Sequence, residues 1–240
     1  MPTAMRPRFA CATCYPVGSI EVQYHLAANV HAMPNSLAFT IRGSTTLCEA
    51  VLASGFTNFE QLAIQVRSLR YQRTSNPDRP LAVLEEGRGT CSSKHQLLAA
   101  VAHESGHFEV GLTVGIYEMS EQNTPGVGVA LASASLKSVP EAHCYLTVDG
   151  ERFDFTGLPS GPLSPFDALL SEHTVLPGDL AEAKSRLHRA AVTTWAAAAG
   201  VPEESVWITR EACIAALVAN HKLEQARRGC VLIGSEPNIP

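Results

Sequence analysis

The chain carries a cysteine, a histidine and an aspartate in an order and in local settings that suit nucleophilic catalysis. Cys91 follows the Gly-containing segment 85–90 (EEGRGT) and stands at the predicted start of a helix. A thiol in the first helical turn faces unpaired backbone N–H groups and the positive end of the helix dipole, and both stabilise the thiolate. His143 and Asp154 follow later in the chain. A carboxylate beside an imidazole fixes its tautomer and favours the protonated form that a Cys–His ion pair needs.

A predicted hairpin brings the histidine and the aspartate together. Residues 141–157 (EAHCYLTVDGERFDFTG) alternate as two strands joined by a tight turn at Asp149-Gly150. In this hairpin His143 opens the first strand and Asp154 lies on the returning strand, within side-chain reach of it. Cys144 follows His143 directly, and we expect it to point to the opposite face of the strand.

The segment around the cysteine also supplies candidates for holding a substrate. The apolar spacing predicts a helix that begins at Cys91 and ends at Gly106, which is a natural left-handed terminator. Gly87 and Gly89 allow the backbone to approach a bound carbonyl, so that main-chain N–H groups form an oxyanion hole. The candidate oxyanion-binding and substrate-binding residues are Gly89, Thr90, Lys94, His95 and Tyr145.

Two segments together resemble a known family. Residues 83–119 (VLEEGRGTCSSKHQLLAAVAHESGHFEVGLTVGIYEM) are similar to the core of the transglutaminase-like superfamily, with a Gly-Xaa-Cys entry to a helix, a Gly stop and a strand. The hairpin 141–157 resembles the two other elements of that core. The resemblance implies a papain-like fold, with Cys91 as nucleophile, His143 as base and acid, and Asp154 as the orienting residue.

We therefore expect a cysteine-nucleophile hydrolase or acyltransferase that acts on a peptide, a glutamine side chain or a small amide through an acyl-enzyme. Attack of water on that intermediate would make the protein a protease, amidase or deamidase, and attack of an amine would make it an acyltransferase. The sequence leaves both open. The triad requires neither a metal nor an organic cofactor.

Two other functions are weighed against this one. Residues 103–107 (HESGH) satisfy the H-E-x-x-H pattern, which predicts a zinc metallohydrolase if His103, Glu104 and His107 share a helix. Gly106 and the strand-like residues after it argue against a continuing helix. Cys11 and Cys14 have C-x-x-C spacing, which without a second pair is a weak metal or redox pattern. A second alternative is a non-catalytic binding domain that retains the fold.

The remaining pattern predicts an α+β protein with an antiparallel sheet packed on the cysteine-bearing helix and with additional C-terminal helices. Strands are expected within Ile20–Ile41, and a helix from Thr57, whose spacing from Glu60 is that of a capping box. Residues 120–140 are expected to form a mobile loop that borders the active site. The predicted organisation is an N-terminal tail (1–18), a catalytic core (19–160) and a helical C-terminal extension (161–240).

Composition restricts the partners. The chain of 240 residues has a formal net charge of -5 and a pI near 6.0, which argues against nucleic-acid binding. Its seven cysteines are an odd number and lie far apart, unlike a secreted disulfide framework. No apolar leader or membrane span is apparent, so we expect a cytoplasmic protein without a membrane partner.

Overall fold

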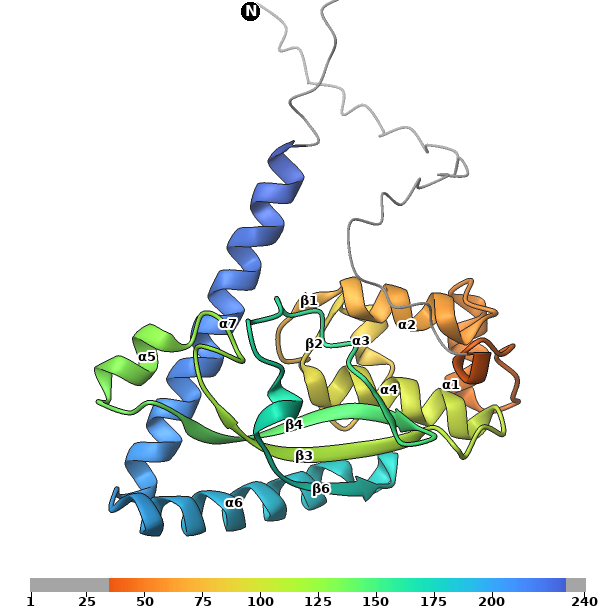
Figure 1. Cartoon of the computed structure of the whole chain (residues 1–240). Helices are drawn as coiled ribbons and strands as arrows, with labels where there is room; N and C mark the ends of the chain where they lie inside the picture. The colour runs from red at the N-terminus through yellow and green to blue at the C-terminus, as the bar shows by residue number, and fades with distance from the viewer. Residues whose placement is uncertain (1–34, 232–240) are drawn as a thin grey trace, which may run out of the picture. The chain divides into compact units, whose positions relative to one another are not determined.

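The structure is a computed structural model that describes residues 35–231. Its centre is a four-stranded antiparallel sheet in the order β5-β4-β3-β6 (Figure 1). The strands are β3 (Gly111–Met119), β4 (Val139–Val148), β5 (Glu151–Phe153) and β6 (Leu169–Val175). Helices pack against this sheet, and two long helices complete the chain. The expected α+β class with an antiparallel sheet is therefore confirmed.

The helix α4 (Cys91–Glu104) packs on β4, and its buried apolar residues belong to the larger hydrophobic core cluster. Its N-cap is Thr90, which forms a capping box with Ser93, so the backbone amides of these two residues are satisfied. It ends before Gly106, whose φ of 90° lies in the left-handed region. The predicted start at Cys91 is confirmed, and the last helical residue, Glu104, lies two residues before the predicted stop at Gly106.

Shorter elements surround α4 on the N-terminal side. They are η1 (Asn35–Leu37), α1 (Thr46–Ala53), α2 (Phe59–Ser68), α3 (Ala82–Glu85) and a two-stranded parallel sheet of β1 (Arg70–Tyr71) and β2 (Arg88–Gly89). Residues from α1, α2 and α4 share one core cluster. Because β2 leads directly into Thr90, the small sheet sets the point at which α4 begins.

The predicted hairpin is confirmed. β4 and β5 are joined at Asp149 and Gly150, whose φ values of 51° and 82° are both positive. A two-residue turn of this kind matches the twist of the flanking strands and fixes their register. Phe153 therefore pairs with Leu146, and the chain leaves β5 at the next residue.

The C-terminal part of the chain forms a second hydrophobic cluster with the sheet. α6 (Leu180–Ala199) runs along the lower side of the view in Figure 1, and α7 (Glu203–Val231) runs upward from its end. α5 (Gly128–Ser133) packs on α7, and the short helices η2 (Pro165–Ala168) and η3 (Pro177–Asp179) flank β6. No helix within residues 35–231 is both long and apolar enough to cross a bilayer.

Several local predictions were wrong. The expected strand at residues 37–41 is only an isolated bridge between Thr40 and Asn58, and Ile20–Leu26 lies outside the described residues. α2 is capped by Asn58, whose side chain accepts from the amides of Glu60 and Gln61 and so replaces Thr57 in the predicted cap.

The predicted helical extension from residue 161 onward is also only partly right. Ser164 caps the short helix η2, but the chain then enters β6, which pairs with β3 along the edge of the sheet. Pairing with β3 at the edge of the sheet satisfies the backbone N–H and C=O groups of β6, which a helix would have satisfied through its own intrahelical hydrogen bonds. The predicted tail 1–18 lies outside the described residues.

Candidate functional site

Cys91 occupies the first turn of α4 and is 5% exposed. Its thiol is free, and it lines a cavity of about 870 Å³. The first backbone N–H groups of α4 lie at the same end of the helix, and an N-terminal helix end favours negative charge. The setting is therefore one in which a thiolate is stabilised and accessible from a cavity.

His143 lies within β4, which begins at Val139, and not at the start of the strand as predicted. Its Nε2 hydrogen-bonds Oδ2 of Asp154 at 2.8 Å, and Asp154 follows directly after β5. The other carboxylate oxygen accepts from the backbone amide of Thr156 at 2.8 Å, which fixes its orientation. Because Nε2 is engaged by the carboxylate, Nδ1 is the ring nitrogen left for Cys91, whose side chain helps to raise the pKa of His143. The structure thus brings the three predicted triad residues together.

The electrostatics of these groups favour an ion pair. Burial opposes the charge on His143, but the carboxylate of Asp154 and the side chain of Cys91 outweigh it and raise the pKa of the imidazole to about 10. The pKa of the Cys91 thiol is held well below its ordinary value by hydrogen bonding from Cys144, by Lys184 and by His143, against the effect of burial. Both shifts favour a thiolate that faces an imidazolium.

Three further groups surround the sulfur of Cys91. Lys184 on α6 places Nζ 3.7 Å from Sγ of Cys91 and donates to Oγ of Ser92 at 2.7 Å. Sγ of Cys144 lies 3.6 Å from the same hydroxyl, and Cys144 helps to lower the pKa of the Cys91 thiol. The expectation that Cys144 points away from the site is wrong, because α4 packs directly on β4 and its first turn reaches Cys144 as well as His143.

The cavity in front of Cys91 is built largely by the C-terminal helices. It is lined by Tyr71, Arg73, Thr74, Pro77, Thr90, Cys91, Ser92, Ser93, Gln96, Glu141, Leu180, Ala181, Lys184, Ser185, His188, Arg189, Trp207, Arg210 and Ile214. Sequence reasoning did not identify the contribution of α6 and α7. One signal was present, since Leu180, Lys184 and His188 recur every fourth residue on one face, with a lysine where an apolar residue is expected.

A buried ion pair joins α7 to β4 at this cavity. Arg210 donates from Nε and Nη2 to the two carboxylate oxygens of Glu141, at 2.5 and 2.7 Å. His188 on α6 contacts the backbone carbonyl of Pro140 through Nε2 at 2.9 Å and packs on the ring of Trp207. Burial lowers the pKa of His188, so the imidazole is neutral near pH 7. Glu141, two residues before His143 on β4, thereby ties the strand to both helices.

Of the predicted substrate contacts, Thr90 lines the cavity, whereas Lys94 does not. Lys94 is fully buried, and its Nζ donates to three backbone carbonyls, those of Arg67, Leu69 and Thr156. Burial lowers the pKa of Lys94 to about 7. The expectation that Lys94 contacts a substrate is therefore corrected: it connects α4 to two other segments.

Gly89 and His95 also serve packing. Gly89 lies in β2 against the side chain of Lys94, where a Cβ would come within 2.8 Å of Cγ. His95 is fully buried, contacts the carbonyl of Cys91 through Nδ1 at 2.8 Å and accepts from the amide of Phe155 on Nε2 at 2.7 Å. Burial lowers the pKa of His95 to about 4, so the ring is neutral and holds the segment after β5 against α4.

Tyr145 is fully buried as well, and its hydroxyl donates to Glu172 on β6. None of Gly89, Lys94, His95 and Tyr145 is among the residues that line the cavity. Residues 120–140 do not line it either; within them α5 packs on α7. The expectation of an active-site loop there is wrong, because α5 finds an apolar partner in the C-terminal helix.

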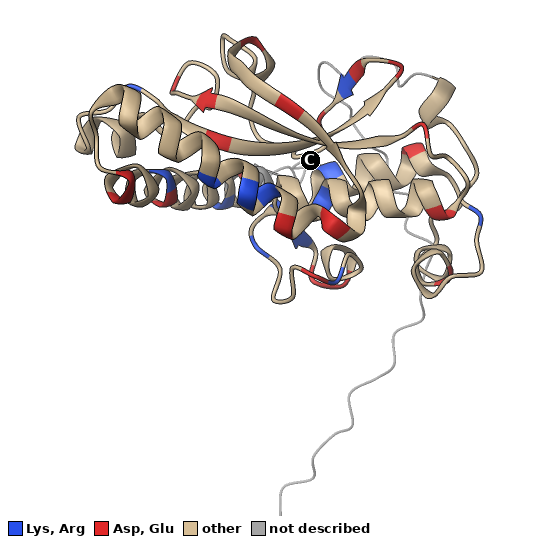
Figure 2. Ribbon diagram, turned by 90° about the horizontal axis from the view of Figure 1, so that it is seen from below, with Lys and Arg blue, Asp and Glu red and all other residues tan. Residues whose placement is uncertain are grey.

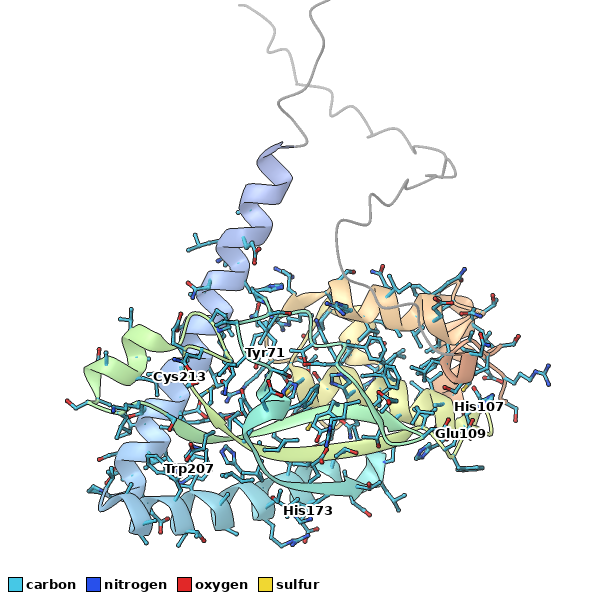
Figure 3. The ribbon with its side chains drawn as sticks, in the orientation of Figure 1. Tyr71, His107, Glu109, His173, Trp207 and Cys213 are labelled. Atoms are coloured by element: carbon cyan, nitrogen blue, oxygen red, sulfur yellow. The ribbon has the colours of Figure 1, made fainter. Side chains whose placement is uncertain are left out.

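The H-E-x-x-H segment does not adopt the helical geometry of a zinc site. α4 ends at Glu104, and His107 lies beyond it, stacked on Phe39 and hydrogen-bonded to Glu109 at 2.8 Å. His103 contacts the carbonyl of Val110 instead. Figure 3 shows His107 and Glu109 far from Tyr71, which lines the cavity.

Within residues 35–231, no three His, Cys, Asp or Glu side chains are grouped to hold a metal ion. Cys11 and Cys14 lie outside these residues. Comparison of the chain with protein-family models, with curated proteins and with solved structures finds no match.

Proposed function

We propose that the protein is a cysteine-nucleophile enzyme that hydrolyses an amide or transfers its acyl group, with Cys91, His143 and Asp154 as the catalytic triad. One observation carries the proposal. The thiol at the N-terminus of α4 opens to a cavity and interacts electrostatically with an imidazole whose Nε2 is held by a carboxylate at 2.8 Å. A nucleophile, a base and an orienting group in this relation are the requirements of acyl transfer.

The reaction follows from the charges at rest. The thiolate of Cys91 attacks the carbonyl carbon, and the C=O π electrons move onto the oxygen to form an oxyanion. His143, as imidazolium, gives its proton to the leaving amine nitrogen as the C–N bond breaks, which leaves a thioester and a neutral imidazole. Water or an amine then attacks the thioester, His143 takes its proton, and the C–S bond breaks to restore the thiolate. Asp154 stabilises the imidazolium each time it forms.

The oxyanion donors in this proposal are backbone N–H groups of the first turn of α4, at Cys91 and Ser92. The first four N–H groups of an α-helix have no partner within the helix. In α4 the capping box satisfies the amide of Ser93 through Thr90, which leaves the two earlier positions. Preorganised donors of this kind contribute about 3–4 kcal/mol to transition-state stabilisation.

The architecture agrees with a transglutaminase-like core, which we propose as the fold. The order of a cysteine-bearing helix, a strand with the histidine and a following segment with the aspartate matches the pattern on which the resemblance was drawn. In this proposal α6 and α7 are additions to that core, because they wall the cavity without supplying a triad member.

Selective alkylation tests the proposal. Iodoacetamide at pH 7 should modify Cys91 before the other thiols, since its pKa is low while burial raises the pKa values of Cys48 and Cys213. Mass spectrometry of proteolytic fragments would locate the adduct. Cys91→Ala should abolish fast labelling, and Cys213→Ala is the matched control that should leave it unchanged. Labelling at Cys144 in place of Cys91 would show that the nucleophile is wrongly assigned.

A screen with amide and ester probes then tests turnover. An acyl-enzyme would appear as a mass increase equal to the acyl group, removable by hydroxylamine because the bond is a thioester. Release in water without an amine would identify hydrolysis, and faster release with added amines would identify acyl transfer. A fast-alkylating Cys91 that no amide or ester acylates would instead indicate a non-catalytic domain.

A further inference from the structure

The cavity in front of Cys91 is positively charged although the protein as a whole is not. Four cationic side chains line it, Arg73, Lys184, Arg189 and Arg210, with Glu141 as the only carboxylate in its lining. The chain carries a formal charge of -5. In the view from below, Lys and Arg lie on the helices that cross the middle of the picture, with Asp and Glu among them (Figure 2). A cavity of opposite sign to its protein selects the charge of what enters it.

The cations of the cavity differ in whether they are already neutralised. Arg210 is committed to Glu141 and Glu211, and Arg73 pairs with Glu211 at 3.1 Å. Lys184 is committed to the sulfur of Cys91 and to Ser92. No carboxylate within residues 35–231 pairs with Arg189, which is exposed at the cavity. Arg189 is therefore the cation available to an incoming anion.

The position of Arg189 relative to the nucleophile sets the distance at which an anion would be held. It follows Lys184 by five residues on α6, and five residues advance a helix by about 7.5 Å. Leu180, Trp207 and Ile214 offer apolar surface in the same cavity. A guanidinium is well suited to a carboxylate, which it binds through two parallel hydrogen bonds. The volume of about 870 Å³ is that of a site for a short peptide or a comparable molecule.

We propose that the acyl substrate is an amide bearing a carboxylate, which Arg189 binds while the apolar lining covers the carbon chain and Cys91 attacks the carbonyl. This inference rests on the proposed function, since it names the substrate class of that same site. Lys184 contributes to the attraction through its charge, but Arg189 makes the contact.

Two alkylating probes of equal length distinguish recognition of the carboxylate charge from recognition of the shape of the probe. N-(iodoacetyl)-4-aminobutanoate carries a carboxylate, and its primary amide is the neutral match. The variants are Arg189→Gln, Arg189→Lys and, as matched control, Arg186→Gln, an exposed arginine of the same helix that does not line the cavity. The measurement is the rate of alkylation of Cys91 by each probe, by mass spectrometry, at low and at high salt.

The carboxylate probe should label Cys91 about three- to tenfold faster than the amide probe in the unaltered chain, the range expected for a partly exposed ion pair. Arg189→Gln should abolish this preference, and Arg189→Lys and Arg186→Gln should retain it; high salt should reduce it. Equal rates for the two probes, or a preference that survives Arg189→Gln, would overturn the inference and leave the proposed function intact. Failure of both probes to label Cys91 above the other thiols would overturn both.

Discussion

Replacing Lys184 by methionine removes the ammonium group beside the nucleophile while keeping most of the packing of the side chain. Nζ of Lys184 lies 3.7 Å from Sγ of Cys91. Two unit charges at that separation attract by about 1 kcal/mol in water and about 4 kcal/mol at an effective dielectric constant near 20. Since about 1.4 kcal/mol corresponds to one pH unit, the thiolate should form about 1 to 3 pH units higher in Lys184→Met.

The assay is the rate of alkylation of Cys91 by iodoacetamide as a function of pH, because only the thiolate reacts. The midpoint of this profile should rise in Lys184→Met, and Lys184→Arg, which keeps the charge, should remain close to the unaltered chain. Arg186→Met controls for loss of a positive charge elsewhere on α6. Circular dichroism would establish that each variant is folded. An unmoved midpoint in folded Lys184→Met would refute the view that the lysine stabilises the thiolate.

Three further outcomes are expected. Asp154→Asn should lower turnover about 10²- to 10⁴-fold and lower the pKa of His143 from about 10. Turnover is lost at alkaline pH where the imidazolium gives up its proton, so this loss should move to lower pH in the variant. An unchanged alkaline limb of the pH profile would contradict this. Cys144→Ala should slow alkylation of Cys91 at pH 7 about three- to tenfold, because the thiolate loses a hydrogen-bond donor, and an unchanged rate would show that this thiol contributes nothing. Lys94→Met should lower the free energy of unfolding in urea by about 1–3 kcal/mol, because three backbone carbonyls lose their donor. The alkylation rate of Cys91 should remain nearly unaltered. A large loss of this rate in the folded variant would restore Lys94 as a functional residue.

The local elements that carry the proposed triad were predictable because each has a short-range cause. The capped, glycine-terminated helix from Cys91 and the two-residue turn at Asp149-Gly150 depend on backbone conformations that a few neighbouring residues decide. The hairpin in turn places Asp154 near His143, since antiparallel pairing follows from the turn. Order along the chain and local geometry were therefore enough to select three residues out of 240.

Tertiary structure decided everything that depends on residues far apart in the sequence. Lys184 stands 93 positions from Cys91, and only the packing of α6 brings its ammonium to the sulfur. Lys94 has the spacing of a substrate contact, but two other segments cover it and supply three carbonyls. Helical spacing determines which residues share a face of a helix, whereas the burial of that face depends on which other segments pack against it. The cavity, its charge and its available arginine therefore arise from the placement of α6 and α7, which no local pattern encodes.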